Sequence, residues 1–438
     1  MKQETALDIL KLGHNVFLTG PAGSGKTYLL KQYIDYLKKN GIGVAVTAST
    51  GIAATHMNGQ TIHSWSGMGI SDTFTEADFK KLKQKNYHRQ RFKKTAVLII
   101  DEVSMLHAHQ LDIINNICKK FKEPFLPFGG LQVILCGDFF QLPPVTPYGQ
   151  EACFVVEAQA WEEMNPKICY LEEQYRQEDR QILKILSDIR SRSCDAQTKK
   201  LLISRANMEI ENNIKPTRLY THNANVDVIN NAELRKIQED AMTFKMTASG
   251  IEYLISSVKK GCLAPEILVL KKGAVVMFVK NNFDRGYVNG TLGKVIDFDS
   301  KGMPIVKTAS GKTIVATPEK WLIEEAGESL ATITQVPLRL AWAITVHKSQ
   351  GMTLDAVEMD LSKSFEYGMG YVALSRVRTL AGIKLLGINN IALEVNPKVY
   401  EMDKLLEELS HKNVSELKKM GLLKKKSAQE KFASRCRR

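Results

Sequence analysis

The stretch Gly20-Pro21-Ala22-Gly23-Ser24-Gly25-Lys26-Thr27 constrains this chain more than any other, because it has the G-x-x-x-x-G-K-T spacing of a phosphate-binding loop. The largely apolar residues 15–19 before it predict a short buried strand. Residues 28–39 after it carry apolar side chains at helical spacing. A loop between a strand and a helix N-terminus can surround a phosphate with backbone N–H groups. We therefore expect the chain to bind a nucleoside triphosphate.

The residue types in this loop predict their roles. Glycines permit the backbone angles that turn successive N–H groups toward one anion. Lys26 is expected to contact the β- and γ-phosphates, and the Thr27 hydroxyl to ligate Mg²⁺. The expected ATP-binding residues of the loop are Gly20, Ala22, Gly23, Ser24, Gly25, Lys26 and Thr27. The loop alone does not separate kinases, GTPases, transporters and motors.

Composition narrows the class of protein. The 438 residues are 44% hydrophobic and 24% charged, which is typical of a globular protein of about two to four domains. Seven scattered cysteines without a C-x-x-C pair favour a reducing, cytoplasmic compartment. No apolar run approaches the length of a membrane span, so no membrane partner is expected. The net charge of +13 favours a polyanionic partner.

The order of predicted elements indicates an α/β fold with a mostly parallel sheet. Strands and helices alternate from residue 15 to about 140, and a second α/β unit is expected to start near residue 167. Alternating strands between about 268 and 340 predict a small β-barrel inserted into that second unit. From residue 412 onward the chain has ten Lys/Arg against two Glu, which predicts a basic tail that adds to nucleic-acid binding.

A basic segment interrupts the first α/β unit at residues 76–94. It carries eight Lys/Arg interleaved with Phe79, Tyr87 and Phe92. Aromatic rings among cations can stack on nucleic-acid bases. The alternative is a solvated helical lobe whose three rings form its own small core.

Polar residues at predicted strand ends complete a hydrolytic site. Asp101 and Glu102 follow the apolar run 97–100, where Asp101 is expected to hold Mg²⁺ and Glu102 to polarise the attacking water. Gln141 follows another strand and is expected near the γ-phosphate or its water. Arg176 and Arg376 are candidates for stabilising the charge on the transferring phosphoryl group.

These stretches together resemble the petite-integration-frequency DNA helicase family of superfamily 1B, near the RecD-like enzymes. The resemblance covers residues 1–392 in motif order. The matching stretches are Gln3, 20–27, 47–54, 61–67, 100–105, 137–145, 173–177, 346–355 and 370–378, with Pro127-Phe128-Gly129-Gly130-Leu131-Gln132 similar to the family's own signature.

The resemblance implies the fold and further site residues. It implies two tandem RecA-like domains, at 1–165 and at 166–265 with 338–405. It also implies a wedge lobe at 66–95, a Src-homology-3-like barrel at 266–337 and a basic tail at 406–438. Gln3 would read the adenine edge, Gly351 would approach the phosphates, and Arg176 and Arg376 would be arginine fingers from the second domain. The residues implied to face single-stranded DNA are Thr50, His63, Ser64, Thr221, His222, His347 and Lys348.

The resulting expectation is an ATP-dependent DNA helicase that uses ATP and Mg²⁺, translocates 5′ to 3′ on single-stranded DNA and unwinds duplex or structured DNA. Single-stranded and forked DNA are the expected partners, with G-quadruplexes and RNA–DNA hybrids left open, and the chain is expected to be a monomer in solution. Two alternatives stay open. One is a translocase subunit of a nuclease or recombination complex, and the other is a non-enzymatic nucleic-acid-binding module.

Overall fold

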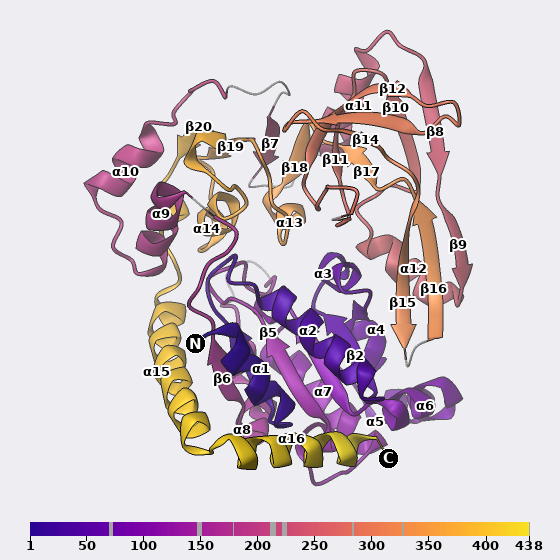
Figure 1. Cartoon of the computed structure of the whole chain (residues 1–438), viewed down its shortest axis with the longest axis vertical. Coiled ribbons are helices and arrows are strands. Elements are labelled where there is room, and N and C mark those ends of the chain that lie inside the picture. Colours follow the sequence, from indigo (N-terminus) through magenta and orange to yellow (C-terminus); the bar gives the residue numbers. More distant parts are fainter. Residues whose placement is uncertain are drawn as a thin grey trace.

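The computed structural model describes residues 1–69, 73–146, 151–177, 179–210, 216–220, 226–282, 284–325 and 328–437. Figure 1 shows a sheet with its helices in the lower half, a second sheet at upper left and a β-rich part at upper right. Two helices of the C-terminal region run along the left edge and beneath the lower half. Within the described residues, no helix is both long and apolar enough to cross a bilayer.

The first domain is built on a six-stranded parallel sheet in the order β3-β2-β4-β5-β1-β6. Its central strands are buried and almost wholly apolar, because helices cover both faces. Its elements are α1 (Gln3–Lys11), β1 (Val16–Thr19), α2 (Lys26–Lys39), β2 (Val44–Ala48), α3 (Gly51–His56), β3 (Gln60–Thr61), α4 (Ile62–Ser66), β4 (Val97–Asp101), α7 (Ala108–Phe121), β5 (Gln132–Cys136), α8 (Gln159–Met164) and β6 (Lys167–Tyr170).

The strand β6 corrects one predicted boundary. The sequence places residues 166–170 at the start of the second domain, but β6 pairs in parallel with β1, from Val16–Lys167 to Thr19–Tyr170. The strand β6 is buried on the first sheet because it pairs with β1, a strand far from it in the sequence. The chain therefore leaves the first sheet only after residue 170.

The second domain has a smaller parallel sheet in the order β18-β7-β19-β20. Its strands are β7 (Thr217–Tyr220), β18 (Ala343–Thr345), β19 (Val357–Leu361) and β20 (Ile383–Ile388). Its helices are α9 (Arg180–Arg190), α10 (Ala196–Ile203), α11 (Val226–Arg235), α13 (Val346–Ser349) and α14 (Met369–Leu374). Two parallel sheets with helices packed on them confirm the predicted α/β class.

The β-rich part is larger than predicted. Its described strands form a five-stranded antiparallel sheet, β14-β13-β12-β11-β17, with a three-stranded sheet β15-β16-β9 and a pair β10-β8. Strands β8 and β9, which precede residue 266, pair with β10 and β16, so the unit extends N-terminally beyond the predicted 266–337. The elements are β8 (Ala241–Lys245), β9 (Thr247–Gly250), α12 (Glu252–Gly261), β10 (Ile267–Lys271), β11 (Val275–Phe278), β12 (Leu292–Phe298), β13 (Pro304–Thr308), β14 (Thr313–Val315), β15 (Glu319–Glu325), β16 (Glu328–Gln335) and β17 (Leu338–Leu340).

The basic segment folds as two helices, α5 (Glu76–Gln84) and α6 (Asn86–Lys94). Phe92 stacks on Phe121 of α7 with ring centroids 4.4 Å apart, and Phe79 packs edge-on against the same ring. Both phenylalanines are buried, and the half-buried Tyr87 lies beneath the Arg91 guanidinium. The idea that these rings are available to stack on bases is wrong for Phe79 and Phe92, because they form the lobe's packing against α7.

The C-terminal region is not a solvated tail. It forms α15 (Pro397–Lys419), which packs along β6, and α16 (Leu422–Cys436), which lies across α1 (Figure 1). Phe432 and Ala433 are buried in the cluster that holds α1 and α2. The segment is therefore not a separate tail in the described residues up to 437, since part of it belongs to the core of the first domain, whereas the expected role of its cations in nucleic-acid binding stays a prediction.

Candidate functional site

The phosphate-binding loop joins β1 to α2 as predicted. Gly20, Gly23 and Gly25 have φ angles of +138°, +85° and +83°, which side chains rarely adopt. A Cβ at Gly20 would lie 2.4 Å from the Leu171 carbonyl oxygen, so space as well as backbone angle requires glycine there. The loop is therefore tightly fixed against the segment that follows β6.

The cation and hydroxyls of the loop are arranged for an anion. Lys26 Nζ donates to the carbonyl oxygens of Gly20 and Pro21, at 2.7 and 3.0 Å, which holds the ammonium group over the loop. The Ser24 hydroxyl is buried and has no hydrogen-bond partner among the described residues. A buried polar group without a partner costs free energy, and a phosphate oxygen would satisfy it. The loop residues therefore fit a triphosphate.

Two side chains flank the loop where a base would lie. Gln3, the first residue of α1, donates from Nε2 to the Ser24 carbonyl at 3.2 Å. Tyr175 is 58% exposed, and its backbone N–H donates to the Gly23 carbonyl at 2.9 Å. The amide of Gln3 can hydrogen-bond a base edge, and the exposed ring of Tyr175 offers a face on which a base can stack.

The predicted acids Asp101 and Glu102 lie at the end of β4. Glu102 adopts a left-handed conformation with φ +54°, stabilised where its N–H donates to Asp101 Oδ1 and the Ser49 hydroxyl donates to its carbonyl. Burial and the neighbouring Asp101 charge raise the pKa of Glu102 to about 7, although Lys26 and Arg376 oppose that shift. A carboxyl that titrates near neutrality is suited to accept a proton from water.

Gln141 and Gln350 bring the two domains together at Glu102. Gln350 Nε2 donates to Glu102 Oε2 at 3.0 Å and to Gln141 Oε1 at 3.3 Å. Gln141, which follows β5, is thus linked to the Glu102 carboxylate through Gln350, and its predicted place near the γ-phosphate or its water stays a prediction. Gln350 has no predicted role. The predicted Gly351 next to it has φ +77° and lies against the His56 ring at the end of α3.

The two arginines meet at the same place. Arg176 lies on the segment between β6 and α9, not on an element of the second sheet, and its Nη1 donates to the Ser375 carbonyl at 3.4 Å. Arg376, which follows α14, is 1% exposed and donates to oxygens of Val372, Met352 and Ser375. Burial and the neighbouring Arg176 lower the pKa of Arg376 to about 9. Among the described residues neither guanidinium forms a direct ion pair, although the nearby Glu102 charge acts to raise the pKa of both, so the pair can accept an incoming anion.

The predicted magnesium ligands are Thr27 and Asp101. The Thr27 side chain is exposed at the start of α2, and Asp101 is buried at the end of β4. No group of three or more His, Cys, Asp or Glu side chains gathers as a metal cage in the described ranges. Mg²⁺ commonly binds one or two protein oxygens together with substrate phosphates, so this sparse donor set fits that ion.

The residues implied to face DNA lie beyond the carboxyl ends of parallel strands in both domains. Thr50 follows β2 and caps α3, while His63 and Ser64 lie in α4 after β3. His347 and Lys348 form the last turn of α13 after β18, and Thr345 caps that helix. A Cβ at Gly351, just after α13, would lie 3.4 Å from the His56 ring at the end of α3, so the two strand-end edges face each other (Figure 1). Thr221 and His222 lie outside the described residues.

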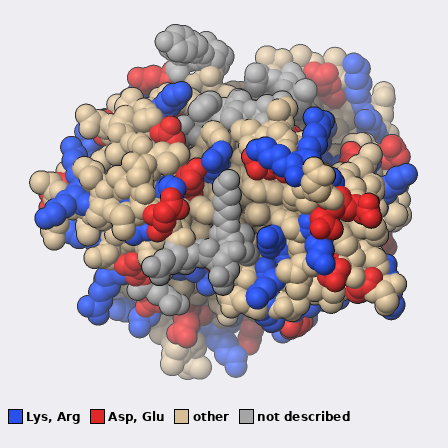
Figure 2. Space-filling view, turned by 90° about the horizontal axis from the view of Figure 1, so that it is seen from above, with Lys and Arg blue, Asp and Glu red and all other residues tan. Residues whose placement is uncertain are grey.

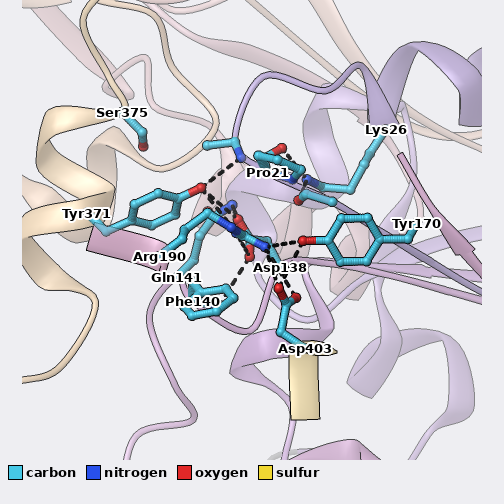
Figure 3. Close-up of polar contacts among 12 residues, drawn as sticks. Pro21, Lys26, Asp138, Phe140, Gln141, Tyr170, Arg190, Tyr371, Ser375 and Asp403 are labelled. Atoms are coloured by element: carbon cyan, nitrogen blue, oxygen red, sulfur yellow. Dashed lines mark hydrogen bonds and ion pairs between the residues drawn. The ribbon is translucent and has the colours of Figure 1, made fainter. Parts of the chain in front are cut away.

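Sequence reasoning missed a buried polar network next to this site, drawn in Figure 3. Arg190 at the end of α9 donates to Asp138, Tyr371, Tyr170 and Asp403. A signal was present, because Arg190 lies four residues after Leu186 and so falls on the apolar face of an amphipathic helix. A charge on an apolar helix face indicates a buried partner, but its identity depends on tertiary structure.

Known proteins resemble this chain in sequence and in fold. The model of the PIF1-like helicase family matches residues 2–191, and the model of the DNA helicase Pif1 2B domain matches residues 253–298. The ATP-dependent DNA helicase Pif1 of Psychrobacter sp. is 46% identical, covering 94% of this chain and 71% of the relative. Across the curated relatives compared, the match spans from 57% to 92% of each relative's length.

Solved structures give the same result. Pif1 from Bacteroides sp. in complex with ADP-AlF4 has a TM-score of 0.80 at 30% identity, over 93% of this chain and 96% of that one. Bacteroides Pif1 in complex with ADP-AlF3 and ssDNA has a TM-score of 0.65 at 31% identity, over 93% and 96% of the two chains.

Proposed function

The chain belongs to the PIF1-like helicase family, and on this premise we propose that it uses ATP hydrolysis to move 5′ to 3′ along single-stranded DNA and to unwind forked duplexes. Like its relatives it is an ATP-dependent DNA helicase. The observation that supports the proposal most directly is the guanidinium pair of the half-buried Arg176 and the buried Arg376, which forms no direct ion pair with a carboxylate among the described residues. Such a pair is unfavourable unless an anion joins it, and the adjacent phosphate-binding loop supplies the place for one.

The hydrolytic roles follow from the geometry. Lys26 and the loop amides hold the β- and γ-phosphates, and Gln3 contacts the base. Glu102 accepts the proton of the attacking water, which Gln141 helps to orient. Arg176 and Arg376 stabilise the charge that develops on the transferring phosphoryl group. When Mg²⁺ is bound by Thr27 and Asp101, it neutralises charge on the phosphate oxygens.

Coupling to DNA depends on the contacts between the domains. Gln350 and the two arginines lie outside the first sheet and approach the nucleotide from the other side. Their contacts with the γ-phosphate are therefore present before hydrolysis and lost after it. Thr50, His63 and Ser64 on the first domain and His347 and Lys348 on the second are proposed to hold the DNA backbone. A change in the distance between domains would then move one set of contacts along the strand relative to the other.

The lobe of α5 and α6 is proposed to separate the strands through its charge and shape. Seven of its eight cations are exposed, and they are Lys80, Lys81, Lys83, Lys85, Arg89, Lys93 and Lys94. The eighth, Arg91, is buried and donates to the Trp65 carbonyl of α4, which ties the lobe to the helix that carries His63 and Ser64. Figure 2 shows that the described Lys and Arg residues on the upper face of the molecule are interleaved with Asp and Glu.

The experiment that tests this proposal is strand displacement with matched duplexes bearing a 5′ or a 3′ single-stranded tail. We expect ATP-dependent displacement of the 5′-tailed substrate, and none by the Lys26→Ala variant. Displacement of only the 3′-tailed duplex would reverse the polarity. DNA-stimulated ATPase without displacement would favour a translocase subunit of a larger complex, and DNA binding without any ATPase would favour a binding module.

A further inference from the structure

The polar network around Arg190 joins α9 to the segment after β5, to β6, to α14 and to α15. Arg190 Nη1 donates to Asp138 Oδ1 at 2.7 Å, and Nη2 donates to the Tyr170 hydroxyl at 2.9 Å and to Asp403 at 3.2 Å. Its guanidinium carbon lies 4.0 Å from the centroid of the Phe140 ring. The carboxyl of Asp138 is 1% exposed, so this ion pair is withdrawn from water. Figure 3 shows the guanidinium at the centre of these groups.

The network reaches the phosphate-binding loop through one hydroxyl. The Tyr371 hydroxyl accepts from the Ala22 backbone N–H at 3.0 Å and donates to Asp138 Oδ2 at 3.3 Å. Tyr371 lies on α14, which leads directly to Ser375 and Arg376. The helix that ends next to the arginine finger is therefore hydrogen-bonded to the loop that holds the phosphates.

Asp138 also orients the glutamine of the hydrolytic site. Its carboxyl accepts from the Phe140 N–H at 3.2 Å and from Gln141 Nε2 at 3.4 Å. Burial alone would raise the pKa of Asp138, but the charges of Arg190 and Lys26 hold it below its usual value. Without Arg190, that buried carboxylate would be uncompensated and would protonate or turn away, and its bonds to Gln141 and Tyr371 would change.

We propose that Arg190 is a positioning residue for ATP hydrolysis: by holding Asp138, it sets the position of Gln141 and, through Tyr371, of the helix that carries Arg376 relative to the phosphate-binding loop. Arg190 does not itself reach the nucleotide. This inference rests on the proposed hydrolytic function of the site. Because the network contacts Ala22 and not the amides at the start of α2, its loss should disturb the transition state more than the binding of ADP.

The test compares Arg190→Gln with wild type in the full-length chain, with oligo-dT as the single-stranded DNA. We expect kcat for ATP to fall by about tenfold to a hundredfold, as small displacements of catalytic groups do. The affinity for ADP should stay near that of wild type. The tightening of ADP binding by aluminium fluoride, which mimics the transferring phosphoryl group, should be largely lost. A residue that only stabilised the fold would lower the melting temperature without removing this tightening.

Two further variants keep the test decisive. Tyr371→Phe removes one hydroxyl and keeps the ring, so it should fold even where Arg190→Gln does not, and it should reproduce the loss of kcat and of fluoride tightening. Arg180→Gln, an exposed arginine at the other end of α9, is the matched control and should behave as wild type. If folded Arg190→Gln or Tyr371→Phe hydrolyses ATP and tightens with aluminium fluoride as wild type does, the inference is wrong. If wild type and Arg180→Gln show no ATPase, it is the proposed function that fails.

Discussion

Replacing Phe432 by alanine should detach the C-terminal helix α16 from the first domain. The Phe432 ring is 5% exposed and covers Gly13, where a Cβ would lie 2.2 Å from a ring atom. The other anchors of α16 are weaker, because the Lys425–Asp8 ion pair is partly exposed and the Arg437 contacts to Asn40 lie at the surface. Phe432 is therefore the largest buried apolar side chain that attaches α16, beside the smaller Ala433 and the Gln429 hydrogen bonds to Asp8.

The expected magnitude follows from burial. Phe→Ala substitutions at buried sites cost about 3–5 kcal/mol, and the low end applies here because a terminal helix can relax around the lost ring. A local loss of about 3 kcal/mol corresponds to about a hundredfold more frequent opening of α16. Since α16 packs on α1, whose first residue is Gln3, the KM for ATP should rise while kcat with saturating ATP and DNA stays close to wild type.

The measurement is amide hydrogen exchange of α16 and α1, combined with ATPase kinetics. Leu423→Ala, on the same helix and 86% exposed, is the matched control and should leave both unchanged. Wild-type protection of α16 in Phe432→Ala would refute the packing argument. Loosened helices with an unchanged KM would show that α16 does not support the base-binding end of α1.

Three further results are expected. Because only the carboxylate form of Glu102 can accept a proton, kcat/KM for ATP should fall as the pH drops through about 7. In a pH–rate profile, the Glu102→Gln variant should be slow at every pH and should lack this transition. Single-turnover hydrolysis by Arg376→Ala should slow by about a thousandfold with little change in ADP affinity. The Arg378→Ala variant, at an exposed neighbouring position, should hydrolyse ATP at the wild-type rate. Equal rates for the two variants would show that Arg376 does not act in the site. Phe92→Ala should destabilise the α5–α6 lobe by about 3 kcal/mol or more, so its amide hydrogens should exchange faster with solvent. Arg89→Ala, at an exposed position of the same lobe, should leave amide exchange unchanged. Wild-type amide protection in Phe92→Ala would contradict the role of Phe92 in packing against α7.

The local parts of the site could be predicted from the sequence because their geometry is set within a few residues. A glycine-rich turn after an apolar strand determines the phosphate-binding loop, and acids or amides directly after a strand lie at the carboxyl edge of a parallel sheet. Lys26, Asp101, Glu102 and Gln141 accordingly lie where their sequence neighbours place them. The α/β class follows from the same alternation of strands and helices.

Tertiary structure decided everything that depends on distant partners. Residues 167–170 form a strand whichever domain they join, and only pairing with β1 assigns β6 to the first sheet. From the sequence, the aromatic rings of α5 and α6 fit a stacking surface or a core equally well, and only the packing of Phe121 of α7 against Phe79 and Phe92 assigns those two to a core. A single phenylalanine, Phe432, in a basic helix does not produce the apolar periodicity that predicts a packed helix. Its ring is nevertheless buried against Gly13, which makes α16 part of the fold. Arg190 shows the same limit, because the sequence places a charge on an apolar helix face, but only the folded chain brings Asp138, Tyr371 and Asp403 to it.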